Sequence, residues 1–313
     1  MTNGDHFDGR KFFNPSGPAL QPFTSLPRLL LTPRTPWPRF VPVTQQEPPE
    51  RHGSDVVVTF IGHSTFLIQT PAATILTDPV FSDHAGPFGL LGPRRVRRPG
   101  IVLDRLPHVS LILLSHNHYD HCDLRALRTL AQRFDPSVIT PLGNAKLLRA
   151  AGFRRVEELD WWGETSAGEI SVAVTPAQHF SARTPFDRNR ALWGGFVITS
   201  GTQRIYFAGD TGYTAVFKEL YDRTGAVDLA LLPIGAYEPR WFMQAIHMNP
   251  AEAVQAHLDL RASASVAMHF GTFQLTPEGI DEPVRALADA RARHGVAPGA
   301  FRALDVGESM TLA

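Results

Sequence analysis

Residues 115–121 read Ser-His-Asn-His-Tyr-Asp-His, and this short segment concentrates side chains that bind metal ions. It directly follows a wholly apolar stretch that is typical of a buried strand. On an extended turn, His116 and His118 point the same way and can share one metal ion. Asp120 and His121 then reach a second ion nearby. Imidazole and carboxylate ligands suit Zn²⁺, which in catalytic sites keeps one position open for water, so the segment predicts a catalytic metal centre.

Three more candidate ligands, His179, Asp210 and His269, stand where other predicted strands end. Taken alone, each is weak evidence, since a single histidine after a strand is more often a hydrogen-bonded structural residue. A Gly-Asp pair such as Gly209-Asp210 is more often only a turn. Their shared position at the carboxyl ends of strands, together with the 115–121 segment, favours one common site.

The order H-x-H-x-D-H, then a lone histidine, a Gly-Asp pair and a last histidine, resembles the metal signature of the metallo-β-lactamase-fold hydrolases. Other stretches are similar to the branch of N-acylphosphatidylethanolamine-hydrolysing phospholipases D and their bacterial relatives. They are GHST at 62–65, LTDP at 76–79, ELDWW at 158–162, FAGDTGY at 207–213 and PIGAYEPRWFM at 233–243. The similarity covers nearly all of the chain from about residue 55, and the last of these stretches is far more specific to the branch than the metal motif.

This resemblance implies a dinuclear zinc hydrolase with an α/β, four-layer αββα sandwich, two mixed β-sheets inside and helices outside. It implies two Zn²⁺ ions per chain, the first on His116, His118 and His179, the second on Asp120, His121 and His269, with Asp210 bridging both. A hydroxide held between the metals would attack phosphorus, so no serine or cysteine nucleophile is required. Asp120, Asp210 and His247 are the residues expected to be catalytic.

Several neighbours of this set have two interpretations. His247 matches a family histidine near the scissile group, where it would contact the phosphate or protonate the leaving group; the alternative is a structural histidine beside a helix. Ile246 stands where the mammalian phospholipase carries a glutamine, which is a departure from the family pattern. Asp78 either orients a metal-bound imidazole or caps its own turn. His63 is expected to pack between strands, and Cys122 is not expected to bind metal.

The elements that must position these residues begin at about residue 55. Short apolar segments separated by turns predict a meander of strands at 56–61, 65–69 and 73–77. Later strands are expected at 111–114, 137–140, 170–175, 193–199, 204–208, 229–232 and 265–269. Helical spacing predicts helices at 123–133, 144–151, 215–221, 250–260 and 282–294. The strands come first as a meander and then alternate with helices, which favours a layered α/β domain.

The first 50 residues hold 10 of the 26 prolines, so a helix or a central strand is not expected there. They also carry large apolar side chains such as Phe12, Phe13 and Trp37, which a disordered tail rarely contains. We therefore expect a proline-rich arm, residues 1–54, that wraps a hydrolase domain, residues 55–313. A floppy leader is the alternative.

Composition excludes several classes of protein. With 313 residues, 43% of them hydrophobic, the chain can bury a substantial core. Its 30 basic and 30 acidic residues cancel, which disfavours a nucleic-acid partner. A lone cysteine cannot form an internal disulfide, and no apolar run approaches the roughly 20 residues of a membrane span. A bacterial cytoplasmic protein is expected, with peripheral membrane association left open.

The expected function is that of a phospholipase D-type phosphodiesterase acting on N-acylphosphatidylethanolamine-like lipids and releasing an N-acylethanolamine. The expected partner is a phospholipid or a small phosphodiester substrate, and a homodimer is left open. The main alternative is a zinc-dependent lactonase or esterase of a sugar-phosphate-like small molecule; a binding protein with a vestigial site and a nucleic-acid-processing enzyme are weaker ones. A lipid enzyme should expose apolar side chains near the site, such as those of 29–31 and Trp37, whereas a lactonase should have a small polar pocket. The basic run 94–98 is either a solvated face or an attractor of anionic head groups.

Overall fold

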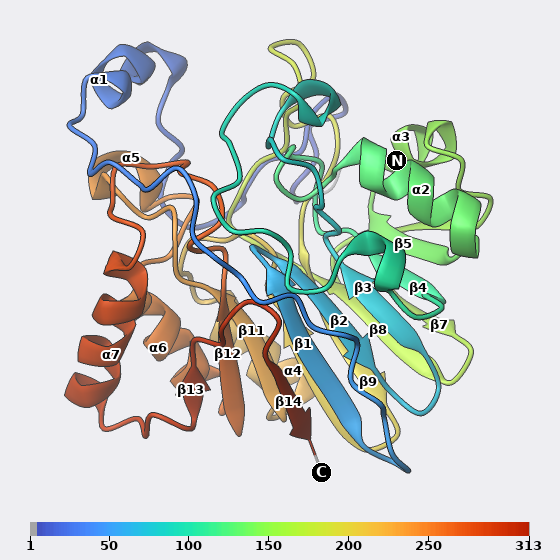
Figure 1. Ribbon diagram of the computed structural model, residues 1–313. Coiled ribbons are helices and arrows are strands. Elements are labelled where there is room, and N and C mark those ends of the chain that lie inside the picture. Colours follow the sequence, from blue (N-terminus) through green and yellow to red (C-terminus); the bar gives the residue numbers. More distant parts are fainter. Residues whose placement is uncertain (1–4, 313) are drawn as a thin grey trace.

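The computed structural model describes residues 5–312, apart from the side chains of Phe23, Leu26 and Leu30. Two seven-stranded β-sheets form its centre, and helices cover them on the outside (Figure 1). The first sheet has the order β14 (Ser309–Leu312), β1 (Val56–Gly62), β2 (Thr65–Gln69), β3 (Thr74–Thr77), β4 (Leu111–Leu113), β5 (Ser137–Pro141), β6 (Val156–Leu159). The second has the order β13 (Phe301–Arg302), β12 (Ala264–Met268), β11 (Leu229–Pro233), β10 (Gln203–Phe207), β9 (Gly195–Ser200), β8 (Ile170–Thr175), β7 (Glu164–Ala167).

Both sheets are mixed, and they follow the same plan. In the first sheet, β14, β1, β2 and β3 pair antiparallel, and β3 to β6 pair parallel. In the second sheet, β7 to β10 pair antiparallel, and β10 to β13 pair parallel. The expected α/β class, with two mixed sheets inside and helices outside, is therefore confirmed.

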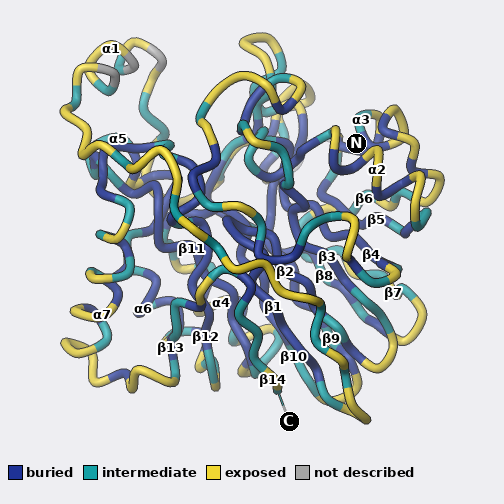
Figure 2. Tube along the Cα trace, viewed as in Figure 1, coloured by how far each residue is buried: buried dark blue, intermediate teal, exposed yellow. Residues whose placement is uncertain are grey.

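The described helices are α1 (Leu26–Leu30), α2 (Leu124–Phe134), α3 (Ala145–Ala150), α4 (Val216–Thr224), α5 (Arg240–Met243), α6 (Pro250–Asp259) and α7 (Glu282–His294), with short 3₁₀ turns η1 (Phe23–Ser25), η2 (Pro87–Gly89) and η3 (Leu103–Arg105). Five of them, α2, α3, α4, α6 and α7, pack against the sheets, whereas α1 stands apart from them (Figure 1). Leu127 of α2 and Leu148 of α3 pack in one buried cluster with strands of the first sheet. A second and larger cluster joins the facing sides of both sheets and includes Phe217 of α4 and Leu287 of α7. Figure 2 shows the strands buried and the exposed positions gathered on loops and outer helix faces.

Local sequence explains why these elements form where they do. The three residues of β4 are all apolar and buried, as a central strand covered on both faces requires. Asp123 caps α2, because its side chain accepts hydrogen bonds from the backbone N–H groups of Arg125 and Ala126. At α6, Asn249 and Glu252 form a reciprocal capping box around the first turn.

The predicted strands and helices of residues 55–294 are present, but the sequence did not reveal all of the elements. The strands β6, β7, β13 and β14 were not predicted; β6 and β7 lie at sheet edges, are largely half-exposed and carry glutamates, so they lack an apolar signal. The expectation of no helix in the proline-rich segment is wrong, since α1 forms there. Pro27 stands in the first turn of α1, where its missing N–H group is not needed.

Residues 5–54 run along the rest of the molecule through contacts widely spaced in sequence. The ring of His6 stacks on that of Trp161 with centroids 4.4 Å apart. The Asn14 side chain donates to the carbonyl of His179 at 2.8 Å, and the Trp37 indole donates to the carbonyl of Glu278 at 2.8 Å. Within residues 5–312, none of the helices combines the length and apolar character that crossing a bilayer requires.

Candidate metal centre

The carboxyl ends of several strands meet at one edge of the two sheets and bring the candidate ligands together. The segment 115–121 follows β4, His179 follows β8, Asp210 follows β10, and His269 follows β12. β8, β10 and β12 run in the same direction, so their carboxyl ends reach the same edge. The seven ligands expected from the resemblance are therefore neighbours in space, although 153 residues separate the first from the last.

Hydrogen bonds hold the 115–121 segment in a fixed shape. The backbone N–H groups of His121 and Cys122 both donate to the carbonyl of His118, at 3.2 and 2.8 Å. The guanidinium of Arg183 donates to the carbonyls of Asn117 and Cys122, at 2.8 and 2.9 Å, and thereby clamps both ends of the turn. Sequence reasoning did not find this arginine, because nothing near it in sequence marks the contact.

Three imidazole nitrogens converge on the first candidate metal position. His118 Nδ1 lies 2.9 Å from His116 Nε2 and 3.2 Å from His179 Nε2. These three atoms all lie within 4.8 Å of one another, as ligands of one ion do.

The second candidate position adjoins the first and combines carboxylate and imidazole. Asp120 Oδ2 lies 3.6 Å from His121 Nε2 and 3.3 Å from His269 Nε2. It also lies 3.1 Å from His63 Nε2, and the His63 ring is 4.2 Å from that of His269. His63, which sequence reasoning placed as a packing residue between strands, is thus part of the cluster. The GHST stretch at 62–65 was the available signal.

Asp210 lies between the two positions. Its Oδ2 atom is 3.0 Å from His121 Nε2 and 3.2 Å from His269 Nε2, which belong to the second position. It is 3.9 Å from His116 Nε2 and 3.7 Å from His179 Nε2, which belong to the first. This geometry fits a carboxylate shared between two ions.

Several polar atoms of the cluster lack the hydrogen-bond partners that a buried polar atom needs. His121 Nε2, His269 Nε2 and Asp210 Oδ1 are buried and have no hydrogen-bond partner among the described residues. Buried polar atoms without partners are rare, because each costs about 1–3 kcal/mol. Divalent ions would supply the missing partners, and the mixture of imidazole nitrogen and carboxylate oxygen is one that zinc accepts.

Burial and neighbouring charges set the protonation of these groups. Burial lowers the pKa of His118 to about 3 and that of His179 to about 4, so both imidazoles keep a free lone pair at neutral pH. Burial also disfavours charge on His269 and His121, but nearby carboxylates, Asp210 foremost, outweigh it. They raise the pKa of His269 to about 9 and that of His121 well above its usual range. In the metal-free protein these two imidazoles therefore hold protons that a metal ion must replace.

Asp78 orients one of the ligands. Its carboxylate is fully buried and accepts a hydrogen bond from His121 Nδ1 at 2.6 Å, which leaves Nε2 of that ring facing the cluster. The same carboxylate accepts from the hydroxyl and the backbone N–H of Ser115, at 2.5 and 2.7 Å. Of the two interpretations given above for Asp78, the geometry favours the orienting one.

His247 also faces the cluster, from the turn that follows α5. Its Nε2 atom lies 3.9 Å from Asp210 Oδ2, and its ring centroid lies 5.1 Å from that of His179. The Arg240 guanidinium donates to the His247 carbonyl at 2.9 Å and is itself paired with Glu252 at 2.8 Å. Burial holds the pKa of His247 well below its usual range, so the ring is neutral in the metal-free protein.

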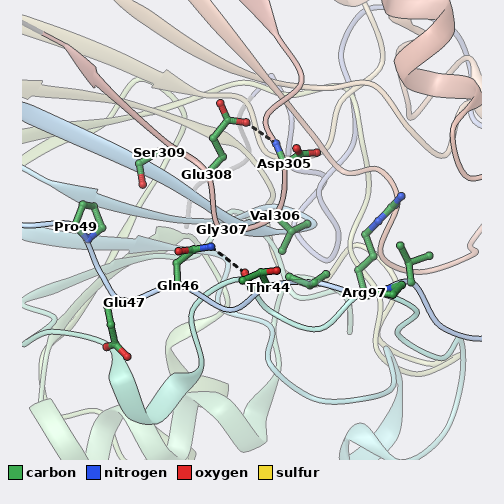
Figure 3. A pocket seen from close by; sticks show the side chains of 13 residues that line it. Thr44, Gln46, Glu47, Pro49, Arg97, Asp305, Val306, Gly307, Glu308 and Ser309 are labelled. Carbon is green, nitrogen blue, oxygen red and sulfur yellow. Dashed lines mark hydrogen bonds between the residues drawn. The ribbon is translucent and has the colours of Figure 1, made fainter.

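Access to the cluster is from the side of the 115–121 segment. His118, Tyr119 and Asp120 are half-buried, whereas His116, His121, His179, Asp210 and His269 are buried. A hollow of about 690 Å³ lies elsewhere, between residues 41–49 and 305–309, and none of the cluster residues line it (Figure 3). That hollow is therefore not the catalytic pocket.

Comparison with known proteins identifies the family. A family model described as a β-lactamase superfamily domain matches residues 73–270. The chain belongs to the β-lactamase superfamily. The metallo-hydrolase Igni18 of Ignicoccus hospitalis superposes with a TM-score of 0.62 at 24% identity, covering 83% of this chain and 99% of that one, which supports the same fold.

Relatives within the β-lactamase superfamily indicate which class of protein the chain resembles. N-acyl-phosphatidylethanolamine-hydrolyzing phospholipase D 1 of Caenorhabditis elegans is 38% identical over 270 residues, which cover 82% of this chain and 75% of the relative. An uncharacterized protein of Mycobacterium tuberculosis is 42% identical over 247 residues, covering 77% of this chain. The chain spans 66% of the length of that mycobacterial relative. Together these relationships place the chain in a family of metal-dependent hydrolases with the metallo-β-lactamase fold.

The role of Asp78 can be tested by metal affinity. Asp78→Asn removes the negative charge that holds the His121 ring, and we expect it to weaken metal binding by about 10- to 100-fold. Competition with a chelator of known affinity measures this. Asp135→Asn, at an ion pair with Arg154 on the surface, is the matched control and should bind metal as the wild type does. Equal affinities in Asp78→Asn and wild type would contradict the orienting role.

Metal uptake should also release protons at neutral pH. The raised pKa of about 9 at His269 means that its proton must leave before the ring can bind an ion, so metal affinity should rise with pH up to about that value. Titration calorimetry at pH 7 in buffers with different ionisation heats counts the protons released. His257→Gln changes a buried imidazole outside the cluster and should leave the count unchanged. A count of zero in the wild type would refute the assigned protonation.

Proposed function

We propose that the protein is a dinuclear zinc phosphodiesterase of the phospholipase D type, acting on N-acylphosphatidylethanolamine-like lipids. The observation that carries this proposal is the position of Asp210 Oδ2 between two groups of donor atoms, as close as 3.0 Å to one and 3.7 Å to the other. Two adjacent metal positions suit in-line displacement at phosphorus.

The relatives support the choice of substrate. The C. elegans relative carries the name of an N-acylphosphatidylethanolamine-hydrolysing enzyme, and so does a mitochondrial protein of Saccharomyces cerevisiae that is 36% identical over 247 residues. The chain covers 75% and 53% of these two proteins.

The chain's own residues would divide the chemical work as follows. His116, His118 and His179 would hold one ion, Asp120, His121 and His269 the other, and Asp210 both. When bound, the ions would supply a nucleophile from water at neutral pH and neutralise charge on the phosphoryl oxygens. His247 Nε2, at the rim of the same cluster, would hydrogen-bond a phosphoryl oxygen or donate a proton to the leaving alcohol. The bond between phosphorus and the ethanolamine oxygen would break, leaving phosphatidic acid.

Exposed side chains favour a lipid over a small polar substrate. Leu31, the residue after α1, is 82% exposed, and exposed apolar side chains in this region are expected of a lipid enzyme. Trp37 does not contribute, since it is half-buried against the carbonyl of Glu278, and the Leu30 side chain lies outside the described residues. The basic run 94–98 is divided. Arg95 is buried and donates to the Val80 carbonyl, and Arg97 is half-buried and donates to the Gly271 carbonyl, whereas Arg94 and Arg98 are exposed.

Turnover of two substrates tests the proposal. Zinc-reconstituted protein should release N-acylethanolamine from N-acylphosphatidylethanolamine in mixed micelles, and it should hydrolyse a lactone much more slowly. Asp210→Asn should lower the rate by more than about a hundredfold, because the shared carboxylate is lost. Chromatography of the released products measures both. Hydrolysis of the lactone alone would disprove the phospholipase assignment while leaving the metal centre intact.

The role of His247 can be separated from metal binding by changing the leaving group. His247→Gln should lower kcat on N-acylphosphatidylethanolamine by about a hundredfold, since a poor alcohol leaving group needs a proton. On bis(p-nitrophenyl) phosphate, whose leaving group needs none, the loss should be far smaller. Metal content measured alongside should equal that of the wild type. Equal losses on both substrates would exclude proton donation and point to phosphate binding.

A further inference from the structure

The most exposed large apolar side chains of the described residues are grouped on three segments. Phe186 is 84% exposed, Leu31 82%, Phe88 81%, Leu90 64% and Leu91 60%. They belong to α1, to the loop between β3 and β4, and to the loop between β8 and β9. Figure 1 shows these segments at the same end of the molecule, with α1 at the upper left and the teal and yellow-green loops at the top. Single exposed apolar residues are ordinary, but a group of them at one end marks an interaction surface.

Phe88 is exposed at an additional cost. Its backbone has φ 61°, in the left-handed region that bulky side chains rarely adopt. The turn around it, Pro87-Phe88-Gly89, could hold a glycine or an asparagine there without strain. Burial of the Phe88 ring does not offset this backbone strain, a combination that is expected where a side chain contacts a partner.

Arginines stand between the two apolar loops. A pocket of about 400 Å³ is lined by Phe88 from one loop and Arg183 from the other, and by Arg125 and Arg128 of α2. Both α2 arginines are exposed, and neither takes part in an ion pair formed by the described residues. The positive charge here is local, because the whole chain has a formal net charge of zero.

The acidic residue that lines the same pocket does not neutralise them. One carboxylate oxygen of Asp123 accepts from the backbone N–H groups of Arg125 and Ala126, at 3.0 and 3.2 Å. The other accepts from the backbone N–H groups of Phe81 and Ser82, at 3.1 and 2.8 Å. Asp123 therefore fastens the apolar loop to α2 and leaves the guanidinium groups available for an outside anion.

This surface adjoins the metal centre. Tyr119, inside the 115–121 segment, lines the pocket, and the Arg183 guanidinium lies 4.0 Å from the centroid of its ring. The half-buried residues of the segment, through which the cluster is reached, are therefore beside the arginines. A large flat partner that covered the apolar loops would face the opening of the site.

We propose that this end of the molecule docks on an anionic phospholipid bilayer, with Phe88, Leu90, Leu91 and Phe186 inserted among the acyl chains. Arg125 and Arg128 receive head-group phosphates in the pocket between the loops. Apolar side chains flanked by arginines match a bilayer, which offers a hydrocarbon interior below a layer of negative charge. The inference rests on the proposed function for its purpose, since docking would bring a lipid head group to the metal centre, but the binding itself is measurable without catalysis.

Vesicle sedimentation tests the docking. The full chain should bind vesicles of phosphatidylcholine with about one third phosphatidylglycerol, and bind pure phosphatidylcholine vesicles far more weakly. Phe88→Gly combined with Phe186→Ser should lower binding by about tenfold, and so should Leu90→Ser combined with Leu91→Ser. Leu258→Ser, at a side chain 40% exposed on α6, is the matched control and should bind as the wild type does. Arg125→Gln with Arg128→Gln should abolish the preference for anionic vesicles.

Two further readouts make a failure interpretable. Phe88→Gly should keep or raise the melting temperature, because glycine relieves the positive φ, so its loss of vesicle binding cannot come from unfolding. The loop variants should hydrolyse soluble bis(p-nitrophenyl) phosphate like the wild type. The proposal would be overturned if the wild-type protein did not bind anionic vesicles. It would also be overturned if analytical ultracentrifugation detected a dimer that buries these loops. Vesicle binding without any phosphodiesterase activity would instead refute the proposed function and leave the docking surface standing.

Discussion

Five imidazole Nε2 atoms lie within 3.9 Å of one carboxylate oxygen, Asp210 Oδ2, and all of the residues involved are buried. Such crowding of polar groups is costly in a protein interior, because each group has lost its hydration and several have no internal partner. Cations in the space between the donors would supply the missing partners. Much of the fold around the cluster fixes the positions of these donor atoms.

That constraint explains where rigidity is placed. The ligands come from turns directly after strands, where the backbone is already fixed by sheet hydrogen bonds, and not from the long loops. Supporting groups then fix the side chains: Asp78 sets the orientation of His121, and Arg183 holds the backbone of the 115–121 segment. The long loops that leave the same strand ends are free to carry other properties, and those of the β3–β4 and β8–β9 connections carry exposed apolar groups.

The sequence predicts the convergence of the candidate ligands better than it predicts the elements around them, for a physical reason. H-x-H-x-D-H places four donors within six residues, so local geometry alone brings them together, and the strand-end positions of His179, Asp210 and His269 extend the pattern. The contact of His63 was not predicted because its partner Asp120 is 57 residues away in sequence, and the GHST stretch around His63 does not indicate which residue it contacts. The edge strands β6 and β7 were not predicted because strands at a sheet edge need few apolar residues. The helix α1 was not predicted because a proline in the first turn cannot be told from a helix breaker until the start of the helix is known.

The two sheets repeat one plan of antiparallel strands followed by parallel ones, and each candidate metal position takes donors from both halves of the chain. The first half contributes residues 116–121, and the second contributes His179, Asp210 and His269. β14, near the end of the described chain, returns to pair with β1 of the first sheet. During synthesis on the ribosome, therefore, the first sheet cannot be completed until β14 has emerged, after every strand of the second sheet. Until then β1 has an open edge, and until β12 has emerged the histidines of residues 116–121 lack His269. The candidate metal ligands therefore come together only late in folding.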